Sequence, residues 1–388
     1  MDNKAILATL KKNAMLIVLV LVYVFFAILT GGGIFSPSSF SELINQNAYV
    51  YILGAGMLMC MLTGGNIDLS CGSFVCLLGA FGGVFMVTLG ISTGLSIVLL
   101  LLIGIAYGAL LGALIAYVHI PPWIATLAGY LSFRGLGTSI LSANSSTGSI
   151  TYPADFQSIF FGKIFPNTKG ELNLPCFIAG LAAAGIVVFL LFSNRKRRMS
   201  KGYEADSLTS VIVKSAAGAA VIIAVMTLLA FDGGIPTTLV WVVGIVLIFT
   251  FITSKTTIGR HFYVVGGNIE AARLSGVNTR RIMFIAYLNM AILSTIASFT
   301  VVSRSHAAYA DIGKNFEMDA ISACVVGGVS ASGGAGTVLG MVIGATLIGV
   351  INLGMSLISL DANWQRVIKG FVLLAAVVFD IVSKKRNK

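Results

Sequence analysis

Two short stretches bring glycine together with small polar side chains between long apolar runs. In residues 63–73 a Gly-Gly pair is followed by four polar residues, which are Asn66, Asp68, Ser70 and Ser73. In residues 327–334 a second Gly-Gly pair is followed by Ser330 and Ser332. Hydroxyl, amide and free backbone groups can hydrogen-bond an uncharged solute, and interrupted backbone at membrane depth survives only where it lines a cavity or is buried in protein. The six side chains are therefore candidates for lining a pathway across a membrane, and the shared order of glycine and serine indicates a weak internal repeat.

Charged residues within or beside apolar runs are candidates for specific contacts. Asp68 could cap a helix that begins near Ser70, or it could line the pathway, and the sequence leaves both open. Arg134 is expected to form an internal salt bridge or a gating contact, because charges inside a membrane are costly and usually paired. Lys214 and Lys369 lie near the starts of apolar runs, so we expect their amines to extend toward the membrane surface.

No set of residues indicates an enzyme or a metal site. The chain has no Gly-x-x-x-x-Gly-Lys-Ser/Thr motif, so it lacks a phosphate-binding loop of that type. Cys71 and Cys76 have no convincing metal-ligand spacing, and the three histidines are scattered. We therefore expect no catalytic residue, no metal and no cofactor bound by this chain.

Composition places the chain in a membrane. Hydrophobic residues make up 57% of the 388 residues and charged residues only 10%, whereas soluble domains carry roughly 25% charged residues. The sequence therefore predicts an all-α, polytopic transmembrane helix bundle formed by 1–388 as a single domain. It has about 10–12 spans, with broken or re-entrant helices near 64–72 and 318–336. The clearest spans are 14–35, 72–90, 95–118, 174–192, 208–231, 235–253, 282–302, 336–358 and 364–383, with shorter or broken ones at 48–63, 122–141 and 318–331.

Basic residues predict the orientation. If both termini are cytoplasmic, the inner segments are 1–13, 64–71, 119–121, 193–207, 254–281 and 384–388. These hold 17 of the 25 Lys and Arg residues, as the positive-inside rule requires. The net charge of +11 is therefore an inner-face bias and does not indicate a nucleic-acid partner. The hydrophilic segment 142–173 becomes an outer loop, either a bare linker or a docking surface.

The inner segment 254–281 has the signals of a short surface helix. Asn268 can cap its N-terminus, Glu270 complements the helix dipole, and Gly276 can end it. This helix could only seal the bundle, or a cytoplasmic partner could grip it. The residues that would contact such a partner are Gly267, Asn268, Glu270, Ala271, Ala272, Arg273 and Gly276.

Several motifs in order resemble one transporter family. The Glu270-Ala271-Ala272 sequence with Gly276 resembles the cytoplasmic loop of ABC importer permeases, and its surroundings resemble the branch that imports ribose and xylose. Further similar blocks are Gly65-x-Ile67-Asp68-Leu69-Ser70-x-Gly72-Ser73, Thr126-Leu127 with Arg134-Gly135, Gly327-Gly328-x-Ser330-x-Ser332-Gly333-Gly334-x-Gly336 and Trp364-Gln365-x-Val367-Ile368-Lys369-Gly370. The length of 142–235 is closer to the xylose and multiple-monosaccharide subgroup.

The resemblance implies a function and a set of partners. It implies a non-catalytic permease of the bacterial plasma (inner) membrane that passes xylose or a related pentose or hexose inward. The partners would be a second permease copy in a homodimer, cytoplasmic ATPase subunits that bind ATP and Mg, and an extracytoplasmic sugar-binding protein. Segment 254–281 would be the coupling loop. The alternative is an ion-coupled secondary transporter, which the scarcity of intramembrane acids disfavours.

Overall fold

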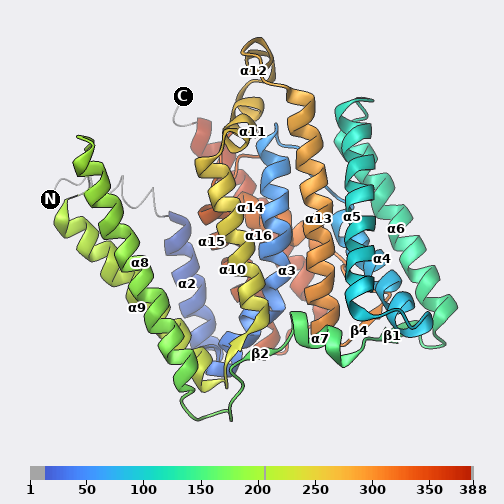
Figure 1. Ribbon diagram of the computed structural model, residues 1–388, viewed down its shortest axis with the longest axis horizontal. Coiled ribbons are helices and arrows are strands. Elements are labelled where there is room, and N and C mark those ends of the chain that lie inside the picture. Colours follow the sequence, from blue (N-terminus) through green and yellow to red (C-terminus); the bar gives the residue numbers. More distant parts are fainter. Residues whose placement is uncertain (1–13, 205–206, 386–388) are drawn as a thin grey trace. The chain divides into compact units, whose positions relative to one another are not determined.

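The computed structural model describes residues 14–204 and 207–385 and is built from helices. The predicted termini, 1–13 and 386–388, lie outside the described residues. Twelve long or broken helices follow the predicted apolar runs (Figure 1). They are α2 (Ala14–Leu29), α3 (Pro37–Leu62), α4 (Cys71–Gly83), α5 (Thr93–Ala116), α6 (Pro122–Asn144), α8 (Leu174–Ser200), α9 (Leu208–Phe231), α10 (Thr237–Lys255), α13 (Thr279–Ser305), α14 (Phe316–Val326), α15 (Val338–Leu357) and α16 (Ala362–Lys385).

The remaining elements are short and lie between these helices. Three are α-helices, namely α7 (Ala154–Phe160), α11 (Thr257–Gly267) and α12 (Ile269–Leu274). A 3-10 turn, Gly33–Phe35, follows α2, and a π-helical turn, Val84–Thr88, extends α4. Two antiparallel strand pairs were not predicted: β1 (Ser149–Thr151) with β4 (Ala307–Tyr309), and β2 (Lys163–Ile164) with β3 (Ile235–Pro236). These short pairs connect the ends of loops. The predicted all-α class is confirmed, because the other elements are helices.

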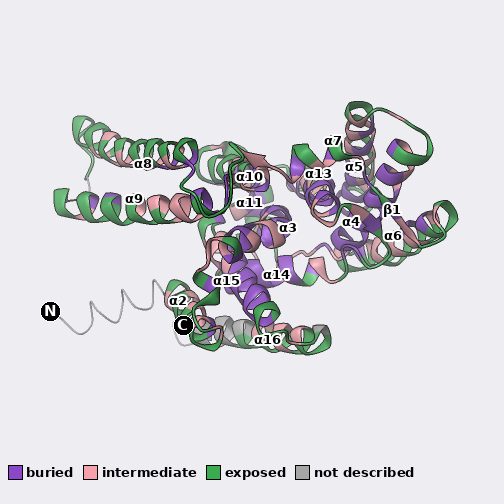
Figure 2. Cartoon of the chain, turned by 90° about the horizontal axis from the view of Figure 1, so that it is seen from below, coloured by how far each residue is buried: buried purple, intermediate pink, exposed green. Residues whose placement is uncertain are grey.

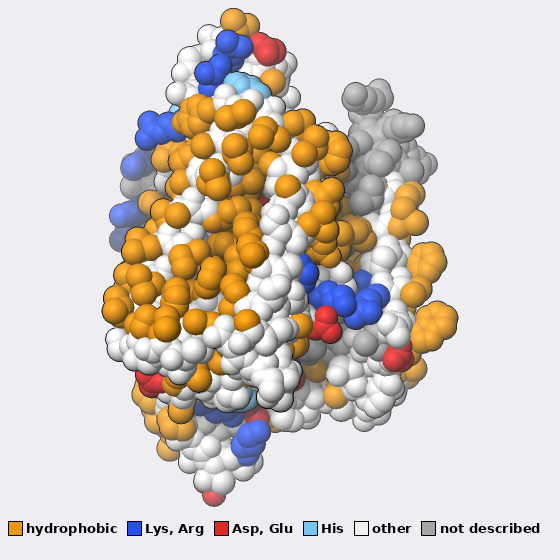
Figure 3. Space-filling view, turned by 90° about the vertical axis from the view of Figure 1, so that its right-hand side faces the viewer, with side chains coloured by type: hydrophobic (Ala, Val, Ile, Leu, Met, Phe, Trp, Pro, Cys, Tyr) orange, Lys and Arg blue, Asp and Glu red, His pale blue; other side chains and the backbone are white. Residues whose placement is uncertain are grey.

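Seven of the described helices are long and apolar enough to cross a membrane. They are Cys71–Thr88, Thr93–Ala116, Leu174–Ser200, Leu208–Phe231, Thr237–Lys255, Thr279–Ser305 and Val338–Leu357. A broad belt of hydrophobic side chains covers the face shown in Figure 3. The chain is a multi-pass membrane protein, and the predicted total of 10–12 spans stays a prediction.

The described chain forms two compact units. The larger comprises residues up to 34, 43–161 and from 238 onward, and the smaller comprises 35–42 and 162–237. The prediction of one permease domain is not tested by this division.

Within the larger unit, α3 is the central helix. All eleven of its residues from Ile52 to Leu62 are buried, and α14 and α15 are also largely buried (Figure 2). Small residues bring helices close, as their spacing predicts. A Cβ on Gly108 of α5 would lie 2.8 Å from the Cβ of Ala291 on α13.

The smaller unit is a hairpin of α8 and α9. A Cβ on Gly180 of α8 would lie 2.5 Å from the Cβ of Met226 on α9, so glycine allows this close pairing. Asn173 caps α8 by accepting the N–H of Cys176 at 3.2 Å. The loop ends are held by Asp232, whose carboxylate lies 2.8 Å from the Lys163 amine.

Candidate coupling and translocation site

Helix α12 forms as its sequence predicts. The Asn268 side chain accepts the N–H of Ala271 at 3.0 Å, which caps the N-terminus. Gly276 adopts a positive φ of 79° and its N–H bonds the carbonyl of Arg273 at 3.0 Å, which ends the helix. Local signals are sufficient here because each cap lies within three residues of the group it satisfies.

Helix α12 lies at the tip of the larger unit and is exposed on most of its surface (Figure 1). Ala272 is fully buried and anchors the helix, while Leu274 is 88% exposed. Glu270, Ala271 and Arg273 are also exposed. Ile269 is 45% exposed as well, so this short helix presents two apolar side chains on its surface.

A cavity of about 600 Å³ lies beside α12. Glu270 and Arg273 line one side, and the segment that joins α5 to α6 lines the other through His119 and Pro121. The sequence predicted 119–121 only as an inner turn and gave it no role. The concave surface therefore combines the predicted helix with a second loop that sequence reasoning missed.

The two predicted breaks meet each other beside α12. The Gly334 N–H donates to the Leu62 carbonyl at 3.2 Å, and a Cβ on Gly333 would lie 2.5 Å from the Cα of Gly64. A Cβ on Gly334 would lie 2.8 Å from the Cα of Gly267, the last residue of α11. We call this contact the glycine junction and define it as Gly64, Gly65, Gly266, Gly267, Gly333 and Gly334. The junction brings the ends of α3 and α11 into contact with the loop that follows α14. Its residue Gly267 directly precedes Asn268, the cap of α12.

Three of the candidate pathway residues shape the loops of this junction. The Asn66 amide donates to the Thr63 hydroxyl at 3.1 Å and to the Thr63 carbonyl at 3.3 Å. The hydroxyls of Ser330 and Ser332 lie 2.9 Å apart, and Ser332 N–H donates to the Ser330 hydroxyl. Ser332 is exposed, whereas Ser330 is buried.

Asp68 fixes the turn before α4, but it does not cap the helix, whose N-cap residue is Ser70. One carboxylate oxygen accepts both the N–H of Ser70 at 2.8 Å and its hydroxyl at 2.6 Å, immediately before α4 begins. The Ser70 hydroxyl also lies 2.7 Å from that of Tyr107 on α5. Asp68 is 1% exposed, so it does not line an open passage in this conformation. Ser73 is buried too, and its hydroxyl has no partner in the described part of the chain.

Arg134 contacts main-chain carbonyls and is not brought to the glycine junction. One guanidinium nitrogen donates to the carbonyl of Ala310 at 3.0 Å and to that of Ile312 at 2.7 Å. Within the described residues no carboxylate pairs with Arg134, so backbone carbonyls are the acceptors of one guanidinium nitrogen, and the other terminal nitrogen has no partner there. The contact fastens α6 to the segment between β4 and α14.

An ion pair that the sequence did not predict joins α14 to α16. The Lys369 amine lies 3.0 Å from Asp319, and its predicted extension toward the membrane surface stays a prediction. The hydroxyl of Tyr49 on α3 donates to the same carboxylate oxygen at 2.5 Å. The rule that intramembrane charges pair, which was applied to Arg134, also predicts a partner for Lys369. Only the fold shows that this partner is Asp319.

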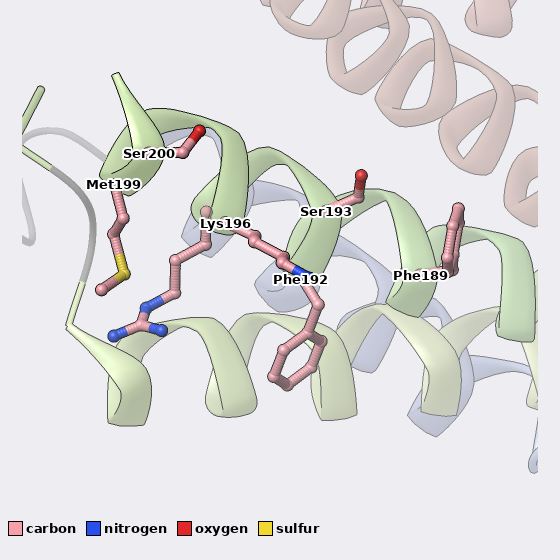
Figure 4. Close-up of a pocket in the computed structure, with 7 residues that line it drawn as sticks. Phe189, Phe192, Ser193, Lys196, Met199 and Ser200 are labelled. Atoms are coloured by element: carbon pink, nitrogen blue, oxygen red, sulfur yellow. The ribbon is translucent and has the colours of Figure 1, made fainter. Parts of the chain in front are cut away.

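A larger cavity, of about 830 Å³, lies elsewhere, in the smaller unit. Its lining comes from α8 alone, with Phe189 and Phe192 on one stretch and Lys196 and Met199 on the next (Figure 4). It contains none of the candidate coupling or pathway residues. Size alone is therefore a poor guide to the functional site of this chain.

Comparison with known proteins identifies the family of the chain. The family model described as branched-chain amino acid transport system / permease component matches residues 39–377. The chain belongs to this family. It is 34% identical to the xylose transport system permease protein XylH of Haemophilus influenzae over 376 residues, which is 96% of each chain.

Two further relatives have related names. The XylH protein of Escherichia coli K12 is 34% identical over 378 residues, which is 96% of this chain and 92% of the relative. The ribose import permease protein RbsC of the same strain is 27% identical over 347 residues, 89% of this chain and 86% of the relative. No solved structure matches the chain. The predicted family resemblance is confirmed.

Proposed function

We propose that this chain is the membrane permease subunit of an ABC importer for a monosaccharide, xylose or a related pentose or hexose. The observation that carries the proposal is similarity to xylose permeases over 96% of the chain. We place it in the bacterial plasma membrane with both termini cytoplasmic, so that α12 faces the cytoplasm. This orientation is supported by the distribution of basic residues along the sequence.

The proposed complex contains three kinds of protein partner for this chain. A second copy completes a homodimer, cytoplasmic ATPase subunits bind ATP and Mg, and a sugar-binding protein delivers the sugar from outside. This chain makes and breaks no bond itself. The exposed face of α12, together with the cavity between it and His119, is the surface that we assign to the ATPase.

In the proposed mechanism, the glycine junction transmits movement from α12 to the loops inside the permease. Closure of the ATPases displaces α12, and Gly266 and Gly267 transmit this displacement to the loops at 63–70 and 327–337. These loops carry the ends of α3 and α14 and the start of α15. Because glycine permits direct backbone contact there, little side-chain material can absorb the movement. Movement of the two loops then opens the pathway on one side and closes it on the other.

The experiment is sugar uptake by proteoliposomes that contain the permease, its ATPase and its binding protein. Glu270→Lys is expected to lower ATP-driven uptake by at least about tenfold while membrane insertion persists. Glu204→Lys makes the same charge change on another exposed loop residue and is expected to leave uptake unchanged. Normal uptake by Glu270→Lys argues against the proposal. Uptake that needs no ATPase and stops with an ionophore supports the ion-coupled alternative.

A further inference from the structure

A second polar cavity lies at the opposite end of α14 from the glycine junction. Its volume is about 490 Å³, within the roughly 300–1,000 Å³ range of small-molecule sites. Helices α3, α14 and α16 line it, and all of them belong to the larger unit in this region. None of the candidate pathway residues predicted from the sequence takes part.

The cavity has a buried polar centre. Asp319, whose side chain is 5% exposed, holds Lys369 at 3.0 Å and Tyr49 at 2.5 Å through one carboxylate oxygen. The Tyr49 ring stacks on Phe316, with centroids 3.6 Å apart and an interplanar angle of 16°. The ring stack and the ion pair hold the centre in one arrangement. Ser322 and Gln365 add a hydroxyl and an amide to the lining.

These groups match an uncharged polyhydroxyl ligand. Sugar hydroxyls both donate and accept, and the lining offers a carboxylate, an amide, a hydroxyl and an amine, together with an aromatic ring. The charges are mostly compensated, since Asp319 pairs with Lys369, and Lys314 pairs with Asp311 at 3.3 Å. Arg366 donates to the side chain of Asn363 at 3.1 Å and is exposed. Two of the three cations of the lining therefore already have a carboxylate partner.

Helix α14 lies between this cavity and the glycine junction, which contacts the residues before α12. The first turns of its 11 residues line the cavity, and its last residue precedes the loop of the glycine junction. At 1.5 Å per residue the helix is about 16 Å long, short enough to move as a rigid body. The six-residue loop 327–332 joins α14 to Gly333, so one helix and one short loop connect the cavity with the glycine junction.

We propose that this cavity is a transit site for a neutral monosaccharide, and that α14 couples its opening and closing to movement of α12. The inference rests on the proposed function and adds to it a place where the sugar pauses on the far side of the glycine junction from the ATPases. Sugar hydroxyls bond Asp319, Gln365 and Ser322 there. The binding protein still supplies selection before the sugar enters.

The first test fills the cavity. Ser322→Met replaces a buried small residue in the lining, and Ser132→Met makes the same change at an exposed position on α6. In proteoliposomes with both partners, Ser322→Met is expected to keep binding-protein-stimulated ATP hydrolysis but to lower sugar uptake per ATP by at least about tenfold. Ser132→Met is expected to match the wild type. Wild-type uptake by Ser322→Met overturns the inference.

The second test needs no partner and decides the matter if Ser322→Met does not accumulate. All five native cysteines are buried, so Gln365→Cys gives one accessible thiol in the full chain. D-xylose is expected to slow its labelling by a small thiol reagent, and glycerol or glucuronate at equal osmolality is not. Equal labelling with and without xylose, or stronger protection by glucuronate, overturns the inference. Absence of binding-protein-stimulated ATP hydrolysis in the wild type instead overturns the proposed function, and the labelling result distinguishes the two failures.

Discussion

Gly266, at the end of α11, lies so close to Gly334 that a Cβ added to Gly266 would come within 2.6 Å of the Gly334 nitrogen. These residues are 68 positions apart in the sequence and belong to different parts of the predicted architecture. Gly266 stands two residues before the cap of α12, and Gly334 stands in the break that follows α14. The contact links the surface assigned to the ATPase directly to a broken helix.

Gly266→Ala is expected to disrupt this link. The new methyl group would overlap backbone atoms of Leu62 and Gly334, which cannot rotate away, so the loops must separate. We expect uptake to fall by at least about tenfold while some ATP hydrolysis persists. Gly244→Ala is the matched control, because nothing lies within 4 Å of a Cβ at that position of α10. Equal uptake and coupling by the two variants would contradict the role of the junction.

Two substitutions of Asp68 distinguish the loss of a hydrogen-bond acceptor from the loss of a negative charge. Asp68→Asn keeps an oxygen that can accept the Ser70 N–H, whereas Asp68→Ala removes it. We expect Asp68→Asn to retain most uptake and Asp68→Ala to lose stability by about 1–3 kcal/mol, because the buried Ser70 N–H loses its acceptor. Uptake and thermal unfolding in detergent measure the two effects. An Asn variant as inactive as the Ala variant would show that the negative charge itself is required.

Local and long-range features differ in how far the sequence predicts them. Asn268 and Gly276 specify α12 through bonds to residues at most three positions away, so its cap and its end were predicted correctly. The breaks at 63–70 and 327–337 were also predicted, since glycine and polar residues interrupt apolar runs. Their contact with each other, and with Gly266, depends on how distant helices pack. The pairing of Lys369 with Asp319 is long-range for the same reason.

Asp232 stabilises the loop of the smaller unit in a pH-dependent way. Burial raises its pKa, but hydrogen bonds from Lys163 and Ser41 and the charges of Lys163 and Lys169 outweigh this, so the net pKa is lowered. A lowered pKa contributes stability above the ordinary carboxyl value of about 3.9, and this stability is lost as the pH falls through the lowered pKa.

Asp232→Asn therefore is expected to loosen the β2–β3 pair at neutral pH. We expect hydrogen exchange of the amides near Lys163 to become roughly threefold faster, since partly exposed ion pairs contribute up to about 1 kcal/mol. The ratio between variant and wild type should shrink toward one as the pH is lowered below about 4. A ratio that grows on acidification would contradict the assignment of Asp232 as the charged partner.

Arg134→Met is expected to release the segment between β4 and α14. The variant leaves the carbonyls of Ala310 and Ile312 without their guanidinium donor, and hydrogen bonds to charged groups contribute about 1.5–3 kcal/mol. We expect a lower unfolding temperature in detergent. Arg198→Met, at an exposed position of α8, serves as the control. Identical unfolding temperatures for the two variants would show that the contact adds nothing to stability.

The most direct test asks whether α12 contacts the ATPase subunit in the assembled importer. Leu274→Cys puts a thiol on a side chain that is 88% exposed, in a chain whose own cysteines are all buried. In membranes that contain the complete importer, a short bifunctional reagent is expected to cross-link this residue to the ATPase subunit, and ATP should change the yield. Absence of any cross-link to the ATPase, or labelling of residue 274 by an impermeant reagent added to the outside of intact cells, would contradict the central claim.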